Sequence, residues 1–235
     1  TAGLADRDVI IADGHHRYET ALAYQSERRE VEGDPPEAQA YDYVLMYLAA
    51  AEDPGLCVLP THRIVTTPQS IDVPRLLAAL EEDFELTRVS DGTPLSMAAE
   101  AAQDHTVAIG ACFGGAERWV LRLRDLARAH QGRRDPDVEL AELDVTVLQS
   151  LILDRRLGID AEALARTDQV AYTIDEHEAC ARVATGEAQA AFILNPTRLE
   201  QVWRAATRGL TMPQKSTYFY PKLATGLVIN PLDEH

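Results

Sequence analysis

The hydrophobic positions of the chain form short continuous runs and helical stripes, with polar turns between them. Unbroken apolar runs at 9–12 and 42–51 predict buried strands, because a strand that is covered on both faces needs no polar alternation. Shorter strands are predicted at 56–59, 84–89, 106–113, 118–124, 170–174, 190–194 and 227–229. The two runs on either side of Gly114 and Gly115 predict a hairpin.

Helical spacing of apolar residues alternates with these strands. Helices are predicted at 17–29, 73–82, 95–103, 144–157, 175–185 and 199–207. Asp144 and Asp175 are expected N-caps, and glycines follow both of those helices. Strands and helices therefore mix along the chain with at least one hairpin, which predicts an α+β or mixed α/β fold with a mixed sheet.

Composition narrows the class of protein. The 235 residues carry 38 acidic against 22 basic side chains, a formal charge of −16 that disfavours duplex nucleic acid as a partner. No apolar run is long enough to cross a membrane. The three cysteines lie far apart without a C-x-x-C pair, so reduced buried thiols and a cytoplasmic location are expected. The composition is compatible with a homodimer.

One polar turn stands out, Asp13-Gly14-His15-His16-Arg17, which joins the first apolar run to a helix. A glycine turn that opens a helix is a favourable anion site, because the helix start offers unpaired N–H groups and a partial positive charge. The histidines and Arg17 add side-chain donors that suit phosphate. Phosphate binding is therefore predicted at this turn, whereas the simpler alternative is an ordinary capped loop.

A metal site is a second hypothesis for the same residues. His15 and His16 are adjacent and cannot hold one ion as an i, i+4 pair does. Asp13, His16 and His62 could still converge as ligands of a metal-dependent hydrolase. A Mg²⁺ ion bound by Asp13 and bridged to phosphate is the preferred form, since Mg²⁺ usually takes one or two carboxylates plus phosphate oxygens.

Two other polar segments are candidate companions of this turn. Thr61, His62 and Arg63 follow a predicted strand and could line a cleft, although a solvated loop fits equally well. The closing segment 212–222 holds polar and aromatic side chains, of which Lys215 is a candidate phosphate ligand. No Gly-x-x-x-x-Gly precedes it, so it is not a P-loop. Possible lining residues of this segment are Gln214, Ser216 and Tyr218.

The motifs IADGHHRYETAL, PTHR and MPQKSTYFYPKLATGLVI resemble a bacterial and archaeal family, domain of unknown function 1015, from one end of the chain almost to the other. Members of that family are usually longer at the N-terminus, so a fragment is expected. The first motif also resembles the ParB/sulfiredoxin-like superfamily, in which a Gly-x-x-Arg turn, here Gly14 to Arg17, holds nucleotide phosphates. Free serine kinases of that superfamily carry a very similar Asp-Gly-His-His-Arg turn.

The resemblance implies a nucleotide, ATP or ADP, bound at Gly14–Arg17, with Asp13, His15 and His16 near the transferred phosphoryl group. The kinase's general-base glutamate has no counterpart in the few residues before Asp13. The expected activity is a small-molecule phosphotransferase; the alternatives are a nucleotide-sensing module without turnover and the metal-dependent hydrolase. Residues 1–70 are expected to be the C-terminal part of the phosphate-binding core, and 71–235 an α/β portion whose segment 212–222 returns to the site.

Overall fold

The computed structural model describes residues 2–4, 6–68, 70–102, 107–114, 117–126, 138–166, 168–224, 226–229 and 231–232. The chain divides into two compact units, which are described separately. Unit 1 comprises Thr1–Cys57 and Phe219–His235, and unit 2 comprises Val58–Tyr218. The predicted domain boundary near residue 70 stays a prediction.

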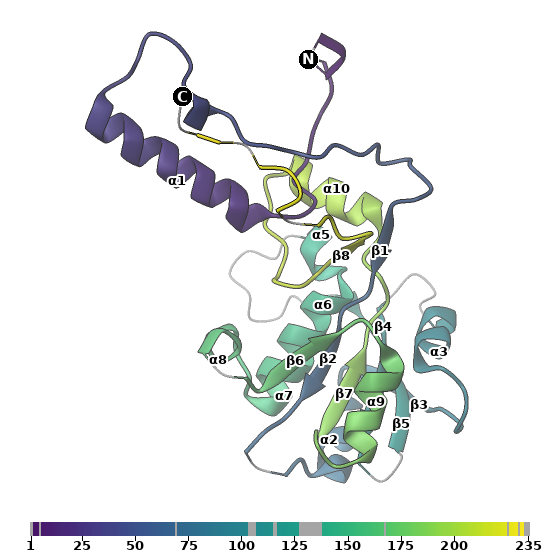
Figure 1. Cartoon of the computed structure of the whole chain (residues 1–235). Coiled ribbons are helices and arrows are strands. Elements are labelled where there is room, and N and C mark those ends of the chain that lie inside the picture. Colours follow the sequence, from purple (N-terminus) through teal and green to yellow (C-terminus); the bar gives the residue numbers. More distant parts are fainter. Residues whose placement is uncertain are drawn as a thin grey trace. The chain divides into compact units, whose positions relative to one another are not determined.

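Unit 2 is built on a six-stranded sheet, which confirms the α+β class (Figure 1). Its strand order is β3 (Phe84–Arg88), β5 (Glu117–Leu123), β4 (Ala108–Phe113), β7 (Ala190–Ile193), β2 (His62–Val65) and β6 (Val170–Thr173). All five pairings are antiparallel, so the sheet is not the mixed sheet that was expected. The predicted hairpin of β4 and β5 is confirmed, although Gly115 lies outside the described residues.

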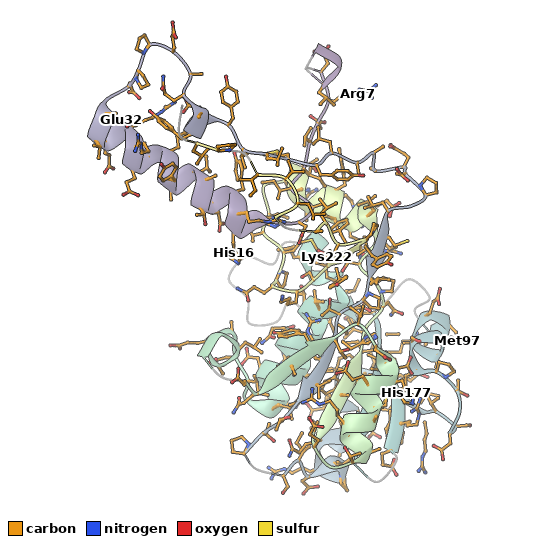
Figure 2. The ribbon with its side chains drawn as sticks, in the orientation of Figure 1. Arg7, His16, Glu32, Met97, His177 and Lys222 are labelled. Atoms are coloured by element: carbon orange, nitrogen blue, oxygen red, sulfur yellow. A yellow bond between two sulfur atoms is a disulfide. The ribbon has the colours of Figure 1, made fainter. Side chains whose placement is uncertain are left out.

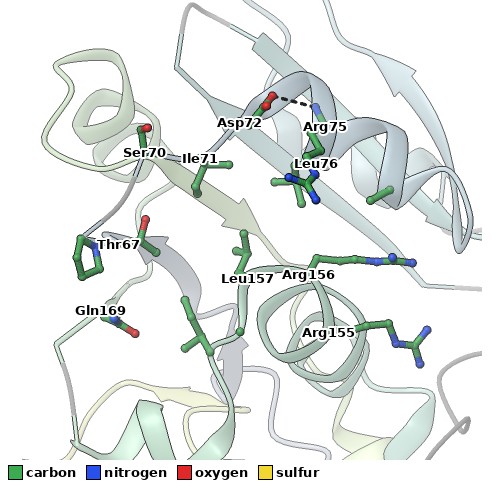
Figure 3. Close-up of a pocket in the computed structure, with 14 residues that line it drawn as sticks. Thr67, Ser70, Ile71, Asp72, Arg75, Leu76, Arg155, Arg156, Leu157 and Gln169 are labelled. Carbon is green, nitrogen blue, oxygen red and sulfur yellow. Dashed lines mark hydrogen bonds between the residues drawn. The ribbon is translucent and has the colours of Figure 1, made fainter.

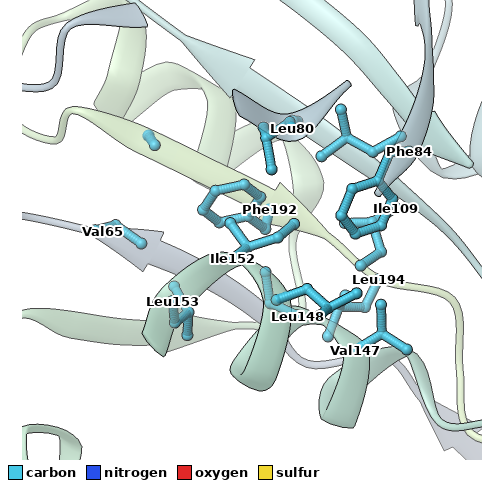
Figure 4. Packing of buried hydrophobic residues seen from close by; sticks show 14 of the residues in the cluster. Val65, Leu80, Phe84, Ile109, Val147, Leu148, Ile152, Leu153, Phe192 and Leu194 are labelled. Carbon is cyan, nitrogen blue, oxygen red and sulfur yellow. The ribbon is translucent and has the colours of Figure 1, made fainter. Parts of the chain in front are cut away.

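Helices cover both faces of this sheet. One face packs against α2 (Val73–Leu80) and the helical stretch formed by α6 (Asp144–Val147), a π-helical segment (Leu148–Asp154) and α7 (Arg155–Leu157). The other face packs against α3 (Leu95–Ala102) and α9 (Glu176–Ala184). Figure 4 shows Leu148 and Ile152 directed toward Phe192 of the sheet.

Alternation along each strand divides its side chains between the two layers. In β7, Phe192 joins the core on the π-helix side, whereas Ile193 joins the core under α9. Gly110 of β4 lies where α3 comes closest, because a Cβ built there would be 2.9 Å from Leu95 Cβ and 3.1 Å from Ile193 Cβ. The sheet therefore accepts no side chain at this position without a shift.

The prediction of reduced, buried thiols is wrong for all three cysteines, in oxidation state for two of them and in burial for the third. Cys112 of β4 and Cys180 of α9 form a disulfide across 68 positions of sequence. The sheet and its covering helix bring together residues that their spacing gave no reason to pair. Cys57 is a free, exposed thiol and not a buried one.

Most helices of unit 2 agree with the sequence pattern. The Asp175 carboxylate caps α9 by accepting from the N–H groups of His177 and Glu178, as predicted. α10 (Leu199–Thr207) also lies where its apolar stripe placed it. The short helices α5 (Val138–Ala141) and α8 (Ala161–Arg166) were not predicted.

Unit 1 is organised around α1 (His15–Glu32), which has no buried residue. Two short 3₁₀ turns, Ala2–Leu4 and Ala40–Asp42, complete its helical structure. Tyr41 is buried and meets Tyr24 edge to face, with ring centroids 6.5 Å apart. Strands β1 (Cys57–Leu59) and β8 (Tyr218–Tyr220) pair with each other where the chain passes between the units.

Three predicted strands of unit 1 are not formed. Residues 9–12, 42–51 and 227–229 have no strand structure. In the longest of these runs the side chains from Tyr43 to Leu48 are 38–71% exposed. The prediction of a central strand assumed apolar neighbours on both faces, and the described residues do not supply them. None of the helices in the described part of the chain has the length and apolar character that a bilayer crossing requires.

Candidate functional site

Helix α1 begins at a turn that only glycine fits well. Gly14 is the N-cap and has a φ of 86°, in the left-handed region. A Cβ on Gly14 would lie 2.7 Å from Arg17 Nη2, so the guanidinium occupies the space of a missing side chain. The close approach and the positive φ together explain why glycine precedes this helix.

Asp13 links two cations at this turn. Its Oδ2 accepts from Arg17 Nη2 at 3.4 Å, and its Oδ1 accepts from Lys222 Nζ at 3.0 Å. Figure 2 labels Lys222 and, at the start of α1, His16. Lys222 was not among the predicted site residues. The lysine predicted from the same segment was Lys215.

The start of α1 also offers backbone donors. Tyr18 N–H is the first to bond within the helix, to Gly14 O at 3.1 Å. The N–H groups of His15, His16 and Arg17 precede that bond and have no intrahelical acceptor. His15 is exposed, and His16 Nδ1 lies 3.2 Å from Glu19 Oε2. The turn therefore combines helix-start N–H groups with two cationic side chains, as an anion site requires.

In unit 2, the predicted strand-end segment is buried and leads into strand β2, which begins at His62. Thr61, His62 and Arg63 are all less than 7% exposed, so the alternative of a solvated loop is wrong. His62 Nδ1 accepts the Leu194 N–H at 3.2 Å, and burial lowers the pKa of this imidazole to about 4. His62 is therefore neutral at physiological pH.

Arg63 connects two of the predicted segments, Thr61–Arg63 and the closing segment 212–222. Its Nη2 donates to Lys215 O at 3.1 Å and to Gln214 O at 3.5 Å. Ser216 is buried, and its hydroxyl donates to Pro213 O at 2.5 Å. Tyr218 is half-buried at the start of β8. Lys215 belongs to unit 2, whereas the Asp13 turn belongs to unit 1.

Asp144 is a buried acid that the sequence did not point to as a site residue. Its Oδ2 accepts from Asn195 N at 3.1 Å and from Asn195 Nδ2 at 2.9 Å. Burial raises the pKa of this carboxyl to about 6. Asp144 is the first residue of α6 and not its N-cap, which is Leu143. The sequence feature that could have pointed to it is an acidic residue at the start of a helix whose inward-facing residues are otherwise apolar.

No group of three His, Cys, Asp or Glu residues lies in a metal-binding arrangement within the described part of the chain. The set of Asp13, His16 and His62 therefore gains no support as a metal centre. His62 in addition already uses Nδ1 for the Leu194 N–H.

Unit 2 also has a cavity of about 630 Å³ that contains none of the predicted site residues. It lies between α2 and α7, and Figure 3 shows Arg75, Leu157 and Gln169 around it. Arg156 lines it as well, but its Nη2 donates to Asp83 Oδ2 at 2.8 Å. Asp83 is buried and takes part in this ion pair.

Together these features define an α+β protein with a cationic turn at the start of one helix. The chain belongs to the family described as "Protein of unknown function (DUF1015)", whose profile matches residues 1–146. None of the curated proteins compared with the chain matches it.

Solved structures of similar shape include two of note. One is a conserved hypothetical protein from Pyrococcus furiosus, at 16% identity and a TM-score of 0.46, covering 89% of this chain and 68% of that one. The other is a free serine kinase in complex with AMP, at 14% identity and a TM-score of 0.47, covering 89% and 66%. The chain thus spans about two thirds of each. Similarities at this level of sequence identity and TM-score support no conclusion about activity.

Proposed function

We propose that this protein binds a nucleotide by its phosphates at the start of α1 and transfers a phosphoryl group to a small molecule. The observation that carries the proposal is the Arg17 guanidinium, which lies against Gly14, the N-cap of α1. Phosphate is bound well by such a combination of guanidinium and helix start. Lys222, which shares Asp13 with Arg17, supplies a second cation.

The superfamily is part of this proposal. The turn from Gly14 to Arg17 has the Gly-x-x-Arg pattern of ParB/sulfiredoxin-like proteins, and a free serine kinase is the model for the activity. Phosphoryl transfer needs mainly positioning and charge stabilisation, which cationic groups provide. Mg²⁺ would be held by Asp13 and the phosphates, with the arginine and lysine released from Asp13 toward the phosphate oxygens.

Calorimetric titration with ADP, ATP and CTP in the presence of Mg²⁺ tests the binding step. Wild type is expected to bind at least one nucleotide, and Arg17→Ala to weaken that binding about tenfold or more, the value of one charge-assisted contact. Arg28→Ala is the matched control, because it removes the same charge near the other end of the same helix. Absence of binding by wild type contradicts the proposal.

A nucleotide-sensing module without turnover is the second candidate. Both carboxylate oxygens of Asp13 are engaged by cations, so this acid is not set up as a base. Incubation with ATP or ADP and free serine separates the two candidates. Phosphorylated product supports the phosphotransferase, whereas tight binding with no product over hours favours the sensor.

A further inference from the structure

We propose that the cavity of unit 2 binds a small organic acid, with its carboxylate on Arg75 and its hydrocarbon part against the apolar wall between α2 and α7. The proposal goes beyond the proposed function, because every residue that lines this cavity belongs to unit 2 and none belongs to the turn at Gly14. The volume of about 630 Å³ lies within the range of small-molecule sites.

Three connections of unit 2 frame the cavity. Thr66 and Thr67 follow β2, Gly158 follows α7, and Gln169 precedes β6. The first and the last of these connections are tied together, because Thr66 N–H donates to Gln169 O at 2.8 Å. Thr67 N–H donates to the side-chain oxygen of Gln189 at 2.7 Å. Hydrogen bonds of the fold itself therefore fix the frame of the cavity.

Apolar side chains form one wall of the cavity. Leu76 and Ile159 are buried, while Ile71, Ala79 and Leu157 are half-buried, and all five line the cavity. Figure 3 shows Ile71, Leu76 and Leu157 bordering the same space. A wall of this kind favours a hydrocarbon group, because the carbon atoms of the ligand leave water when it binds.

Two of the three arginines that line the cavity are already paired. Arg156 Nη2 donates to Asp83 Oδ2 at 2.8 Å and to Glu82 Oε2 at 2.9 Å. Arg155 Nη1 lies 3.5 Å from the same Asp83 oxygen. The charge of these two arginines is therefore largely used within the fold.

Arg75 differs from both of them. It is exposed on α2, and no acceptor among the residues that the structure describes contacts its guanidinium. Asp72, the N-cap of α2, uses Oδ1 for the backbone N–H of Arg75 at 3.1 Å. Figure 3 shows the Arg75 side chain directed from α2 toward Leu157. An available guanidinium thus faces an apolar wall, and a carboxylate fits the two parallel N–H groups of such a fork.

The neighbouring acids favour a singly charged ligand. Asp72 lines the cavity, and Glu82 and Asp83 pair with its arginines, so three carboxylates offset three guanidinium groups. A doubly charged phosphate would need cations in excess, whereas one carboxylate needs one available fork. The side-chain amide of Gln169 makes no hydrogen bond within the described part of the chain and adds a neutral donor at the cavity.

Binding of hexanoate, acetate and inorganic phosphate to the full chain, measured by ligand-observed nuclear magnetic resonance, tests the class of ligand. Hexanoate is expected to bind, and acetate to bind more weakly, since each buried methylene group raises affinity by up to about fourfold. Phosphate is expected not to displace hexanoate. Absence of hexanoate binding at millimolar concentrations, equal affinity for acetate and hexanoate, or displacement by phosphate overturns the proposal.

Three variants locate the site. Arg75→Met keeps the length of the side chain without its charge, and is expected to weaken hexanoate binding about tenfold or more. Arg88→Met is the matched control, because it removes the same charge from β3 at a residue that does not line the cavity, and should change the affinity by less than about twofold. Ala79→Leu fills the cavity from α2 and is expected to abolish binding.

Melting temperature and near-ultraviolet circular dichroism of each variant report on folding. Arg75 and Arg88 are both exposed, so both methionine variants are expected to fold. If Ala79→Leu does not fold, the two methionine variants still decide the question. Unchanged affinity of Arg75→Met for hexanoate, or an equal loss in Arg75→Met and Arg88→Met, overturns the proposal.

Discussion

Unit 2 makes its own core, whereas unit 1 is held largely by polar contacts. All buried hydrophobic side chains of the described residues lie in unit 2 except Tyr41 and Phe219. In unit 1, Gln25 and Arg29 donate to the Asp42 carboxylate at 2.7 and 2.8 Å, while a run of large apolar side chains stays exposed. The candidate phosphate turn therefore belongs to the less well buried unit.

The same substitution should act very differently in the two units. Leu121 of β5 is fully buried, so Leu121→Ala is expected to lower the free energy of unfolding by about 3 to 4 kcal/mol. Leu22 of α1 is 44% exposed, so Leu22→Ala is expected to cost less than about 0.5 kcal/mol. Urea unfolding of both variants measures this contrast. Equal losses would show that unit 1 buries Leu22 as unit 2 buries Leu121.

Asp144 and His62, the buried acid and base of unit 2, make the stability of the fold depend on pH in opposite directions. His62 has its pKa lowered to about 4 from 6.5, so the unfolded chain takes up the proton first and stability falls as the pH drops through this window. Asp144 has its pKa raised to about 6 from 3.8, so the folded chain takes up the proton first and stability rises as the pH drops. The two effects nearly cancel in wild type.

Two single substitutions should separate the pH effect of His62 from that of Asp144. Asp144→Asn leaves the His62 effect alone, and its stability is expected to fall by about 3 kcal/mol between pH 7 and pH 4 relative to wild type. His62→Asn leaves the Asp144 effect, and its stability should rise by a similar amount over the same range. Urea midpoints at several pH values measure both. Parallel pH profiles for wild type and both variants would contradict the assignment.

The glycines at the two ends of α1 separate backbone strain from loss of the site. Gly14 and Gly33 both have a positive φ, so alanine is expected to cost about 1 kcal/mol at Gly14 and about 1–3 kcal/mol at Gly33, whose ψ of −177° lies in a region that is essentially restricted to glycine. A Cβ meets Arg17 at Gly14 but nothing within 4 Å at Gly33. Gly14→Ala should therefore weaken ADP binding in calorimetry, whereas Gly33→Ala should not. Equal effects on binding would mean that only the stability of α1 matters.

The comparison of the units also explains which sequence predictions succeeded. The helices at 73–82 and 175–185 were recognisable because apolar stripes, and for the second helix the Asp175 cap, are local signals, and α2 and α9 form there. Strands β3, β4 and β7 likewise lie where short apolar runs placed them. Every residue of β4 and β7 is buried, because helices cover both faces of the sheet there, whereas β3 is an edge strand with exposed positions.

The failures depend on contacts far along the chain. The run from Tyr43 to Leu48 is as apolar as a central strand, yet the structure leaves it exposed, because burial needs neighbours that periodicity cannot specify. The Asp13–Arg17 turn was visible as a motif, but its partner Lys222 is 209 positions away from Asp13. Pairing of Cys112 with Cys180 was hidden for the same reason.

The most direct test of the central claim is an experimental structure of the full chain with ADP and Mg²⁺. The β-phosphate is predicted to lie within hydrogen-bond distance of the Arg17 guanidinium and of the first N–H groups of α1, with Asp13 released from at least one of its two cations. ADP bound with its phosphates away from the start of α1 would contradict the claim.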